Sequence, residues 1–280
     1  MPRPSDESPV YADLHTHTLC SDGTKSPSAL VAAADARGLQ GLAVTDHDTV
    51  AGVAEAQRTA ERGPDVIPGV ELSAALEDDE VHLLAYGIDP THEALQDHLQ
   101  WMRDARRRRA QKMIEQLRGH GLSIPEDALS AQEGGASAVG RPHVAAVLVA
   151  EGHVDTTREA FEQYLGRDGL GFVAKPRVPA ADVLALVHRV GGIGVLAHPG
   201  DWMSSRHLRR LVHAGLDGIE VHHPSHRPSL AMYYRRQADG HDLIVTGGSD
   251  YHGRTEREER HFGATGMSEP EWERFRAALA

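Results

Sequence analysis

The sequence predicts an α/β fold: a β/α barrel of seven strands with a helical insertion. Three observations lead to this expectation. Short apolar runs alternate with amphipathic segments over the first 91 residues, the alternation resumes after residue 175, and histidine, aspartate or glutamate stands at the end of almost every run. Such alternation indicates parallel strands joined by helical crossovers, as in barrels related to the eight-stranded kind.

The strands are predicted from short apolar runs between turn residues. They cover residues 10–15, 41–45, 66–72, 81–86, 193–197, 218–221 and 243–246. Between them, apolar residues at helical spacing predict crossover helices, two of which end at Gly38 and Gly63. These helices cover residues 27–38, 50–62, 180–189, 206–213 and 229–238.

Residues 92–175 interrupt the alternation and are predicted to form a helical insertion. Residues 93–120 indicate one long helix closed by Gly119 and Gly121, and residues 123–170 carry further short helical signals. Loops are expected at the glycine pair 134–135 and at residues 166–171. The barrel domain is therefore expected to comprise residues 1–91 and 176–280.

The composition limits the class of protein. A 280-residue chain with 40% hydrophobic residues can bury a sizeable core, and its net charge of −12 argues against a surface that attracts nucleic acid or anionic membranes as a whole. The single cysteine, Cys20, excludes an intramolecular disulfide and a thiolate zinc cluster. The first nine residues lack the features of a signal peptide, and no window approaches the ~18 apolar residues of a membrane span. We expect a soluble, cytoplasmic protein.

Nineteen histidines are an unusually large number for a chain of 280 residues, and several of them follow a predicted strand. His15 and His17 lie two residues apart, on the same side of an extended chain, so both imidazoles can reach one metal ion. Ligand-type residues also mark the other strands: Asp46, His47, Asp48, Glu71, His82, His198, Glu220, His222, His223, Asp250 and His252. Because the carboxyl ends of parallel strands share one face of a barrel, these side chains are predicted to converge.

Mixed imidazole and carboxylate ligands suit zinc, manganese or iron better than calcium or magnesium alone. The candidates outnumber the ligands of one tetrahedral ion, which favours two or three divalent ions bridged by a carboxylate. Paired ions clamp a phosphate and activate a water molecule, so hydrolysis of a phosphate ester is the leading expectation for the reaction.

Five segments together resemble signatures of the PHP (polymerase and histidinol phosphatase) family. They are Asp13-Leu14-His15-Thr16-His17, Thr45-Asp46-His47-Asp48, Pro68-Gly69-Val70-Glu71, Ala197-His198-Pro199 and Ser249-Asp250-Tyr251-His252. The resemblance covers most of the chain outside the insertion, and it implies a distorted (β/α)7 barrel with up to three metal ions. The implied ligands are His15, His17, Glu71 and Asp250 for the first ion, Glu71, His82 and His198 for the second, and Asp22, His47 and His252 for the third. Asp22 stands where some members have histidine.

Within the insertion, Gly140-Arg141-Pro142-His143 resembles a motif of the PHP subfamily that acts on nucleoside 3',5'-bisphosphates and on the 5' ends of short RNA. The resemblance implies that Arg141 and His143 grip the substrate phosphate, a role that suits the planar guanidinium of arginine. Lys175 and Arg177, where the chain returns from the insertion, are candidates for contact with a second phosphate.

For some of the candidate site residues, the sequence leaves two roles open. Asp13 and Asp46 can orient a ligand imidazole instead of binding metal. Asp22 can cap a turn before Gly23, and His82 can be a structural histidine within its strand.

Two further groups are open. Strand alternation places Glu220 and His222 on one face and His223 on the other, and we favour His223 as the residue that protonates the leaving group. Arg103, Arg106 and Arg107 share a face of the long helix, where they can guide a polynucleotide or, as we favour, form a solvated surface.

These observations predict a metal-dependent phosphoesterase that removes the 3'-phosphate from nucleoside 3',5'-bisphosphates, with 5'-3' hydrolysis of short RNA as a related activity. Its cofactors are expected to be two or three ions of manganese, iron or zinc. Its substrate is expected to be a nucleotide or short RNA, with no membrane and no obligate protein partner. The alternatives are a histidinol-phosphate phosphatase and a metal-stabilised regulatory module without catalysis.

Overall fold

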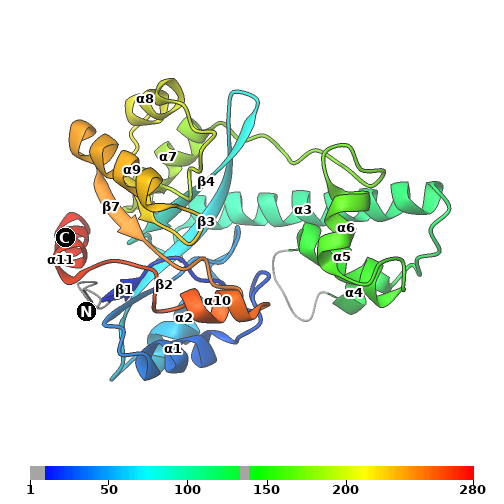
Figure 1. The fold of residues 1–280 in the computed structure, drawn as a ribbon, viewed down its shortest axis with the longest axis horizontal. Helices are drawn as coiled ribbons and strands as arrows, with labels where there is room; N and C mark the ends of the chain where they lie inside the picture. Colours follow the sequence, from blue (N-terminus) through cyan, green and yellow to red (C-terminus); the bar gives the residue numbers. More distant parts are fainter. Residues whose placement is uncertain (1–9, 133–138) are drawn as a thin grey trace, which may run out of the picture.

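The computed structural model describes residues 10–132 and 139–280. Seven strands among these residues form one sheet in chain order, and helices surround it, so the predicted α/β barrel is confirmed (Figure 1). The helices between residues 92 and 175 extend away from the barrel on one side. The loop predicted at the glycine pair 134–135 lies outside the described residues.

The strands curl into a nearly closed barrel. They are β1 (Ala12–Asp13), β2 (Gly41–Val44), β3 (Asp65–Leu76), β4 (Asp79–Tyr86), β5 (Ile193–Leu196), β6 (Gly218–His222) and β7 (Ile244–Gly247). The first and last strands approach each other at their carboxyl ends, where the Leu14 backbone N–H donates to the Gly247 carbonyl at 3.1 Å. Most neighbouring pairs are parallel, which brings the strand ends that carry histidine and carboxylate to one face.

Strand β4 contradicts the expectation of parallel strands throughout, because it runs antiparallel to both β3 and β5. Only Glu77 and Asp78 separate it from β3, and a parallel connection needs a crossover of a dozen or more residues. The hairpin turns at Glu77, whose φ is 53°. As a result, the start of β4 lies at the carboxyl end of β3, where His82 pairs with Ser73.

Helices cover the outside of the sheet and one end of the barrel. Those of the barrel are α1 (Pro27–Ala36), α2 (Val53–Thr59), α7 (Ala180–Arg189), α8 (Ser205–His213), α9 (Pro228–His241), α10 (Glu256–His261) and α11 (Glu269–Ala278). The sequence did not predict α10 and α11. Trp272 and Phe275 of α11 pack with interior strand residues such as Ala43 and Val195, so α11 covers the amino-terminal end of the strands and leaves the opposite end for the site.

The insertion has its own hydrophobic core. It consists of α3 (Glu93–Gly119), α4 (Ala128–Gln132), α5 (Arg141–Ala150), α6 (Thr157–Ala160) and a π-helical turn η1 (Phe161–Leu165). The first half of α3 packs on the barrel through Leu95 and Leu99. Its second half joins the separate core of the insertion through Met113 and Leu117. Helix α3 therefore connects the barrel to the insertion (Figure 1).

No helix in the described ranges is long and apolar enough to cross a bilayer. The cytoplasmic location stays a prediction.

Candidate metal centre and active site

A single buried carboxylate, Glu71 of β3, lies at the centre of the site. Its side chain is 1% exposed, and five imidazoles surround it. The Oε2 atom faces His15 Nε2 at 3.5 Å, His17 Nε2 at 3.4 Å and His47 Nδ1 at 2.8 Å. The Oε1 atom faces His82 Nδ1 at 2.7 Å and His198 Nε2 at 3.1 Å. Two carboxylate oxygens surrounded in this way suit a carboxylate that bridges metal ions.

A second carboxylate closes one side of this cluster. Asp250, which follows β7, places Oδ1 at 3.3 Å from His15 Nε2 and 3.2 Å from His17 Nε2. On the other side, His252 Nε2 lies 3.3 Å from Asp22 Oδ1. The histidines and carboxylates expected as metal ligands therefore all lie in one place, although they come from distant parts of the chain.

Three groups of these side chains bring their ligand atoms within 4.8 Å of one another. The groups are His15, His17 and Glu71, then His47, Glu71 and His82, and lastly His17, Asp22, His47 and His252. The resemblance implied that only Glu71 is shared between ions. In the structure, His17 and His47 each belong to two groups, so the ion that each of them binds stays a prediction.

Unpartnered buried atoms show that this centre fits metal ions. Several buried atoms of the expected ligands lack a hydrogen-bond partner, namely His15 Nε2, both ring nitrogens of His17, His47 Nδ1, Glu71 Oε2 and His82 Nδ1. Buried polar atoms in proteins are usually satisfied. An imidazole nitrogen and a carboxylate oxygen that face one point without a hydrogen bond are what a divalent ion requires.

The mixture of charges shifts the pKa values within the cluster. Burial raises the pKa of Glu71, but His47 and His82 outweigh it and hold this pKa well below its ordinary value. Burial together with the neighbouring His252 lowers the pKa of His17 to about 3. Burial opposes protonation of His82, yet Glu71 raises its pKa to about 9. Without a bound ion, the carboxylate of Glu71 is therefore ionised and His17 is neutral, the states in which both bind metal, whereas His82 is protonated and releases its proton when it binds an ion.

Glu220 of β6 orients two of the candidate ligands. Its Oε1 atom lies 2.9 Å from His15 Nδ1, and its Oε2 atom accepts the backbone N–H of His198 at 2.7 Å. A carboxylate on the far nitrogen of a metal-binding imidazole fixes the ring and raises its basicity. We therefore assign Glu220 a positioning role.

The alternation predicted for residues 220–223 is wrong, because β6 is irregular. Its register with β7 shifts between Glu220 and His222. His222 turns away from the site and lies 3.0 Å from Glu271, whereas His223 Nε2 lies 3.4 Å from Asp250 Oδ2. A bulge of this kind re-aims a side chain, and the His222-His223 pair in the sequence does not reveal it.

Asp13 and Asp46 hold the backbone rather than an imidazole. Asp13 accepts the backbone N–H of Ser249 at 2.9 Å and of His15 at 3.3 Å. Asp46 accepts from Thr18 N–H at 2.8 Å and from the Ser21 hydroxyl at 2.5 Å. These two buried carboxylates fix the segments that carry the candidate ligands.

Asp22 faces the centre and does not cap the turn at Gly23. Its Oδ1 atom faces His252, and its Oδ2 atom forms an ion pair with Arg254 Nη2 at 2.9 Å. Arg254 was not predicted as a site residue, although it stands two residues after His252. Its guanidinium neutralises one oxygen of Asp22 and leaves the other for the candidate third ion.

Strained backbone accompanies the cluster. Asp48, His198 and Asp250 have φ values of 49°, 25° and 51°, in the left-handed region that side chains other than glycine rarely adopt. Such conformations persist where the surroundings over-determine them, and they concentrate at functional sites.

The Gly140-Arg141-Pro142-His143 segment forms the amino-terminal turn of α5. The His143 ring caps this turn, since its Nδ1 atom accepts the Gly140 backbone N–H at 3.1 Å. His143 also lines a cavity of about 320 Å³ that Asp22 and Arg254 share. Arg141 lines a cavity of about 270 Å³ together with His82 and His198. The motif therefore lies beside the metal centre from the insertion side.

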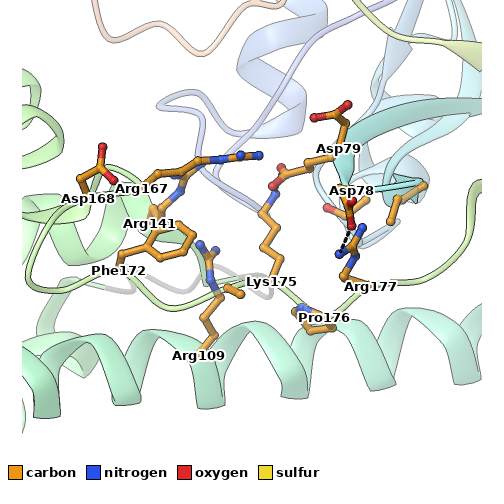
Figure 2. Close-up of a pocket in the computed structure, with 15 residues that line it drawn as sticks. Asp78, Asp79, Arg109, Arg141, Arg167, Asp168, Phe172, Lys175, Pro176 and Arg177 are labelled. Carbon is orange, nitrogen blue, oxygen red and sulfur yellow. Dashed lines mark hydrogen bonds and ion pairs between the residues drawn. The ribbon is translucent and has the colours of Figure 1, made fainter. Parts of the chain in front are cut away.

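A larger cavity of about 470 Å³ lies between the β3–β4 hairpin and the insertion. Figure 2 shows its cations, with Arg109 rising from α3 and Lys175, Arg141, Arg167 and Arg177 around the same space. The cavity also contains four carboxylates, and Lys175 pairs with Glu80 while Arg177 lies 3.1 Å from Asp78. Lys175 Nζ is also 3.5 Å from His82 Nε2, which links this cavity to the centre.

The arginines of α3 match the expected solvated face only in part. Arg107 is exposed and Arg103 is half-buried, whereas Arg106 is buried, 6% exposed, and neither faces water nor guides a polynucleotide along the surface. Arg109, in the same basic run, is also 6% exposed. Arg106 pairs with Asp48 and donates to the Ser73 hydroxyl at 2.8 Å. Asp48 follows His47, so this buried pair connects the insertion to the edge of the metal centre. The sequence does not indicate that Arg106 is buried, because a run of basic residues on a long helix usually faces water.

Burial and the nearby Arg141 lower the pKa of Arg109 to about 10. Two guanidiniums that repel each other at the wall of a cavity favour an anion between them.

Comparison with known proteins identifies the family of the chain. The PHP domain family model matches residues 13–166. The chain is 37% identical over 259 residues to the 5'-3' exoribonuclease Rnm of Escherichia coli, with 87% of this chain and 85% of that protein covered. It is 35% identical to the 3',5'-nucleoside bisphosphate phosphatase of Chromobacterium violaceum, with 86% of each covered.

A solved structure shows the same fold. The structure from Bifidobacterium adolescentis, described as a metal-dependent phosphoesterase, superposes with a TM-score of 0.82 at 38% identity and covers 89% of this chain and 90% of that one. The predicted resemblance and the predicted enzyme class, a metal-dependent phosphoesterase, are thereby confirmed. The chain belongs to the PHP domain family.

Proposed function

We propose that this protein removes the 3'-phosphate from nucleoside 3',5'-bisphosphates by metal-dependent hydrolysis. One observation carries the proposal. The cavity that contains Arg141 also contains His82 and His198 of the metal centre, so a phosphate held by the guanidinium lies beside the candidate ligands. The similarity to the bisphosphate phosphatase of Chromobacterium violaceum supports this choice of substrate.

The residues take distinct roles in this proposal. The nine expected ligands would hold two or three divalent ions of manganese, iron or zinc: His15, His17, Asp22, His47, Glu71, His82, His198, Asp250 and His252. When bound, such ions activate water and neutralise the charge of a phosphoryl group. Arg141 holds the phosphate through its planar fork of donors. His143 fixes the turn that presents Arg141, and it lies where it can contact the same substrate.

His223 is suited to protonate the leaving oxygen. The imidazolium form of His223 is the one that can donate a proton; in that form Nδ1–H can donate to the Ser225 hydroxyl oxygen at 2.7 Å, and the proton on Nε2 remains for the leaving oxygen. That nitrogen is buried, lacks a hydrogen-bond partner and faces Asp250 at 3.4 Å. The proton therefore points toward the centre.

The insertion, residues 92–175, is proposed to supply the rest of the substrate site. Its basic cavity of about 470 Å³ favours a second activity, the 5'-3' hydrolysis of short RNA. Cations in a concave site attract the phosphates of a polynucleotide even when the protein is acidic overall. Lys175 and Arg177 are the candidates for contact with a phosphate that is not cleaved. The similarity to the Escherichia coli protein named as a 5'-3' exoribonuclease supports the second activity.

The test is phosphate release with manganese supplied, from adenosine 3',5'-bisphosphate, adenosine 5'-monophosphate, histidinol phosphate and a 5'-phosphorylated RNA trimer. We expect the bisphosphate to be preferred and to yield adenosine 5'-monophosphate. Shortening of the trimer from its 5' end would establish the second activity. Preference for histidinol phosphate, or no release from any compound, would overturn the nucleotide assignment.

A further inference from the structure

An exposed tryptophan stands at the mouth of the site. Trp202 lies in the loop after β5, four residues beyond His198, and its side chain is 46% exposed. It lines the cavity of about 270 Å³ that contains His82, His198 and Arg141. Exposure alone says little, but at this place a half-exposed indole leaves part of a large flat ring available to a ligand in the cavity.

The loop that carries Trp202 is held firmly. The Tyr234 hydroxyl donates to the Gly200 carbonyl at 2.6 Å, and the Gly200 N–H donates to His226 Nε2 at 3.4 Å. Arg227 forms two hydrogen bonds with Asp201, at 3.0 and 3.1 Å. These contacts come from α9 and the segment before it, so they tie the loop that carries the indole to this part of the barrel.

Gly200 allows the indole to lie close to the backbone. Its φ is +63°, and a Cβ atom there would stand 3.2 Å from Trp202 Cδ1. A larger residue at 200 would be strained and would push the ring from its place. The loop therefore packs one edge of the indole and leaves a large part of the ring exposed at the cavity.

Trp101 gives a comparison within the same protein. It is 48% exposed on α3, and it is not among the residues that line this cavity. Trp272 is only 8% exposed and belongs to the core. Among the three tryptophans, Trp202 is the one that combines an exposed ring with a place beside the metal centre and the phosphate-binding arginine.

We propose that Trp202 stacks on the nucleobase of the substrate while Arg141 holds a phosphate, which makes it a binding residue that selects nucleotides over other phosphate esters. The proposal rests on the proposed function and names the part of the substrate that this loop recognises. Stacking on an aromatic ring tolerates every base, because every base has a π-face. The enzyme is therefore expected to prefer nucleotides without strong preference for one base.

Steady-state kinetics of Trp202→Ala, Trp202→Phe and Trp101→Ala test this proposal. The substrates are adenosine 3',5'-bisphosphate and an abasic ribose 3,5-bisphosphate. We expect Trp202→Ala to raise KM for the adenosine compound about tenfold, which corresponds to about 1.4 kcal/mol, and to leave KM for the abasic compound unchanged. Trp202→Phe should keep most of the affinity because its ring still stacks, and Trp101→Ala should behave as the wild type.

A second readout needs no turnover. In metal-free protein, adenosine 3',5'-bisphosphate should quench tryptophan fluorescence in Trp101→Phe and not in Trp202→Phe. Equal KM values for wild type and Trp202→Ala, with quenching retained in Trp202→Phe, would overturn the stacking proposal and leave the proposed function intact. A wild-type enzyme that hydrolyses no nucleoside bisphosphate would overturn the proposed function itself, and the stacking proposal with it.

Discussion

The metal centre and the cationic cavity contain charged residues in very different states. In the centre, Glu71 and His15 are buried, and several ligand atoms lack hydrogen-bond partners. In the cavity, Arg177 is half exposed and pairs with Asp78, which is almost fully exposed. Buried charged groups whose ligand atoms lack hydrogen bonds indicate reaction chemistry, whereas an exposed ion pair indicates binding that salt can screen. Substitutions in the centre should therefore lower kcat, and substitutions in the cavity should raise KM.

The largest effect is expected for Glu71→Gln. The substitution keeps the shape of the side chain but removes the charge that five imidazoles face. We expect kcat to fall by about 10³-fold, since the loss of one preorganised electrostatic group costs as much in other enzymes. Phosphate release measures the change, and circular dichroism shows whether the variant is folded. A folded variant with kcat close to that of the wild type would contradict the proposal that the charge of Glu71 is required at the metal centre.

Arg106→Met tests the link between the two regions. It leaves Asp48 buried and ionised without its cation, and loss of one partner of a buried pair costs about 3 kcal/mol of stability. The free energy of unfolding, from denaturant titration, should fall by that amount. The double variant Arg106→Met with Asp48→Asn should recover part of the loss, because the unpaired charge is gone. Equal stability of Arg106→Met and wild type would show that the pair does not hold α3 to the barrel.

Arg141→Ala tests the boundary between the two regions, because Arg141 lines cavities on both sides. No carboxylate in the described part of the chain pairs with Arg141, so its guanidinium is available for a phosphate. A lost charge-assisted hydrogen bond costs about 1.5–3 kcal/mol, so kcat/KM should fall at least about tenfold. Arg141→Lys should recover little, since an ammonium does not form the two-pronged contact. Unchanged kcat/KM in Arg141→Ala would rule out its grip on the phosphate.

The smallest effect is expected for Arg177→Ala. This exposed residue shares its charge with Asp78, and an exposed pair contributes about 0–1 kcal/mol. KM for the RNA trimer should rise less than about fivefold, and the change should vanish in high salt. An equally large change for adenosine 5'-monophosphate would mean that Arg177 contacts the cleaved phosphate, which would erase the distinction between the two regions.

Much of this architecture follows from the sequence because its signals are local. The period of the apolar residues places α7 at residues 180–189, the range that the structure shows. The His15 and His17 pair and the residues after the strands identify the centre. The sequence does not reveal the shift in β6 that exchanges His222 for His223, because a bulge depends on the neighbouring strand.

The buried arginines of α3 also depend on contacts far along the chain. Arg106 meets Asp48, which lies 58 residues away, and no local pattern predicts such a partner. The hairpin between β3 and β4 was not predicted, because the predicted strands, residues 66–72 and 81–86, end well short of the two-residue turn that the structure shows between Leu76 and Asp79. Trp202 was not singled out, since its exposure is visible only in three dimensions.

The central claim is that the buried histidines and carboxylates bind the ions required for hydrolysis. The most direct measurement follows phosphate release from adenosine 3',5'-bisphosphate while manganese is added back to protein freed of metal with a chelator. We expect no turnover before the addition and a rise that saturates together with bound manganese, as determined by elemental analysis of the same samples. Full turnover in the metal-free protein would contradict the central claim.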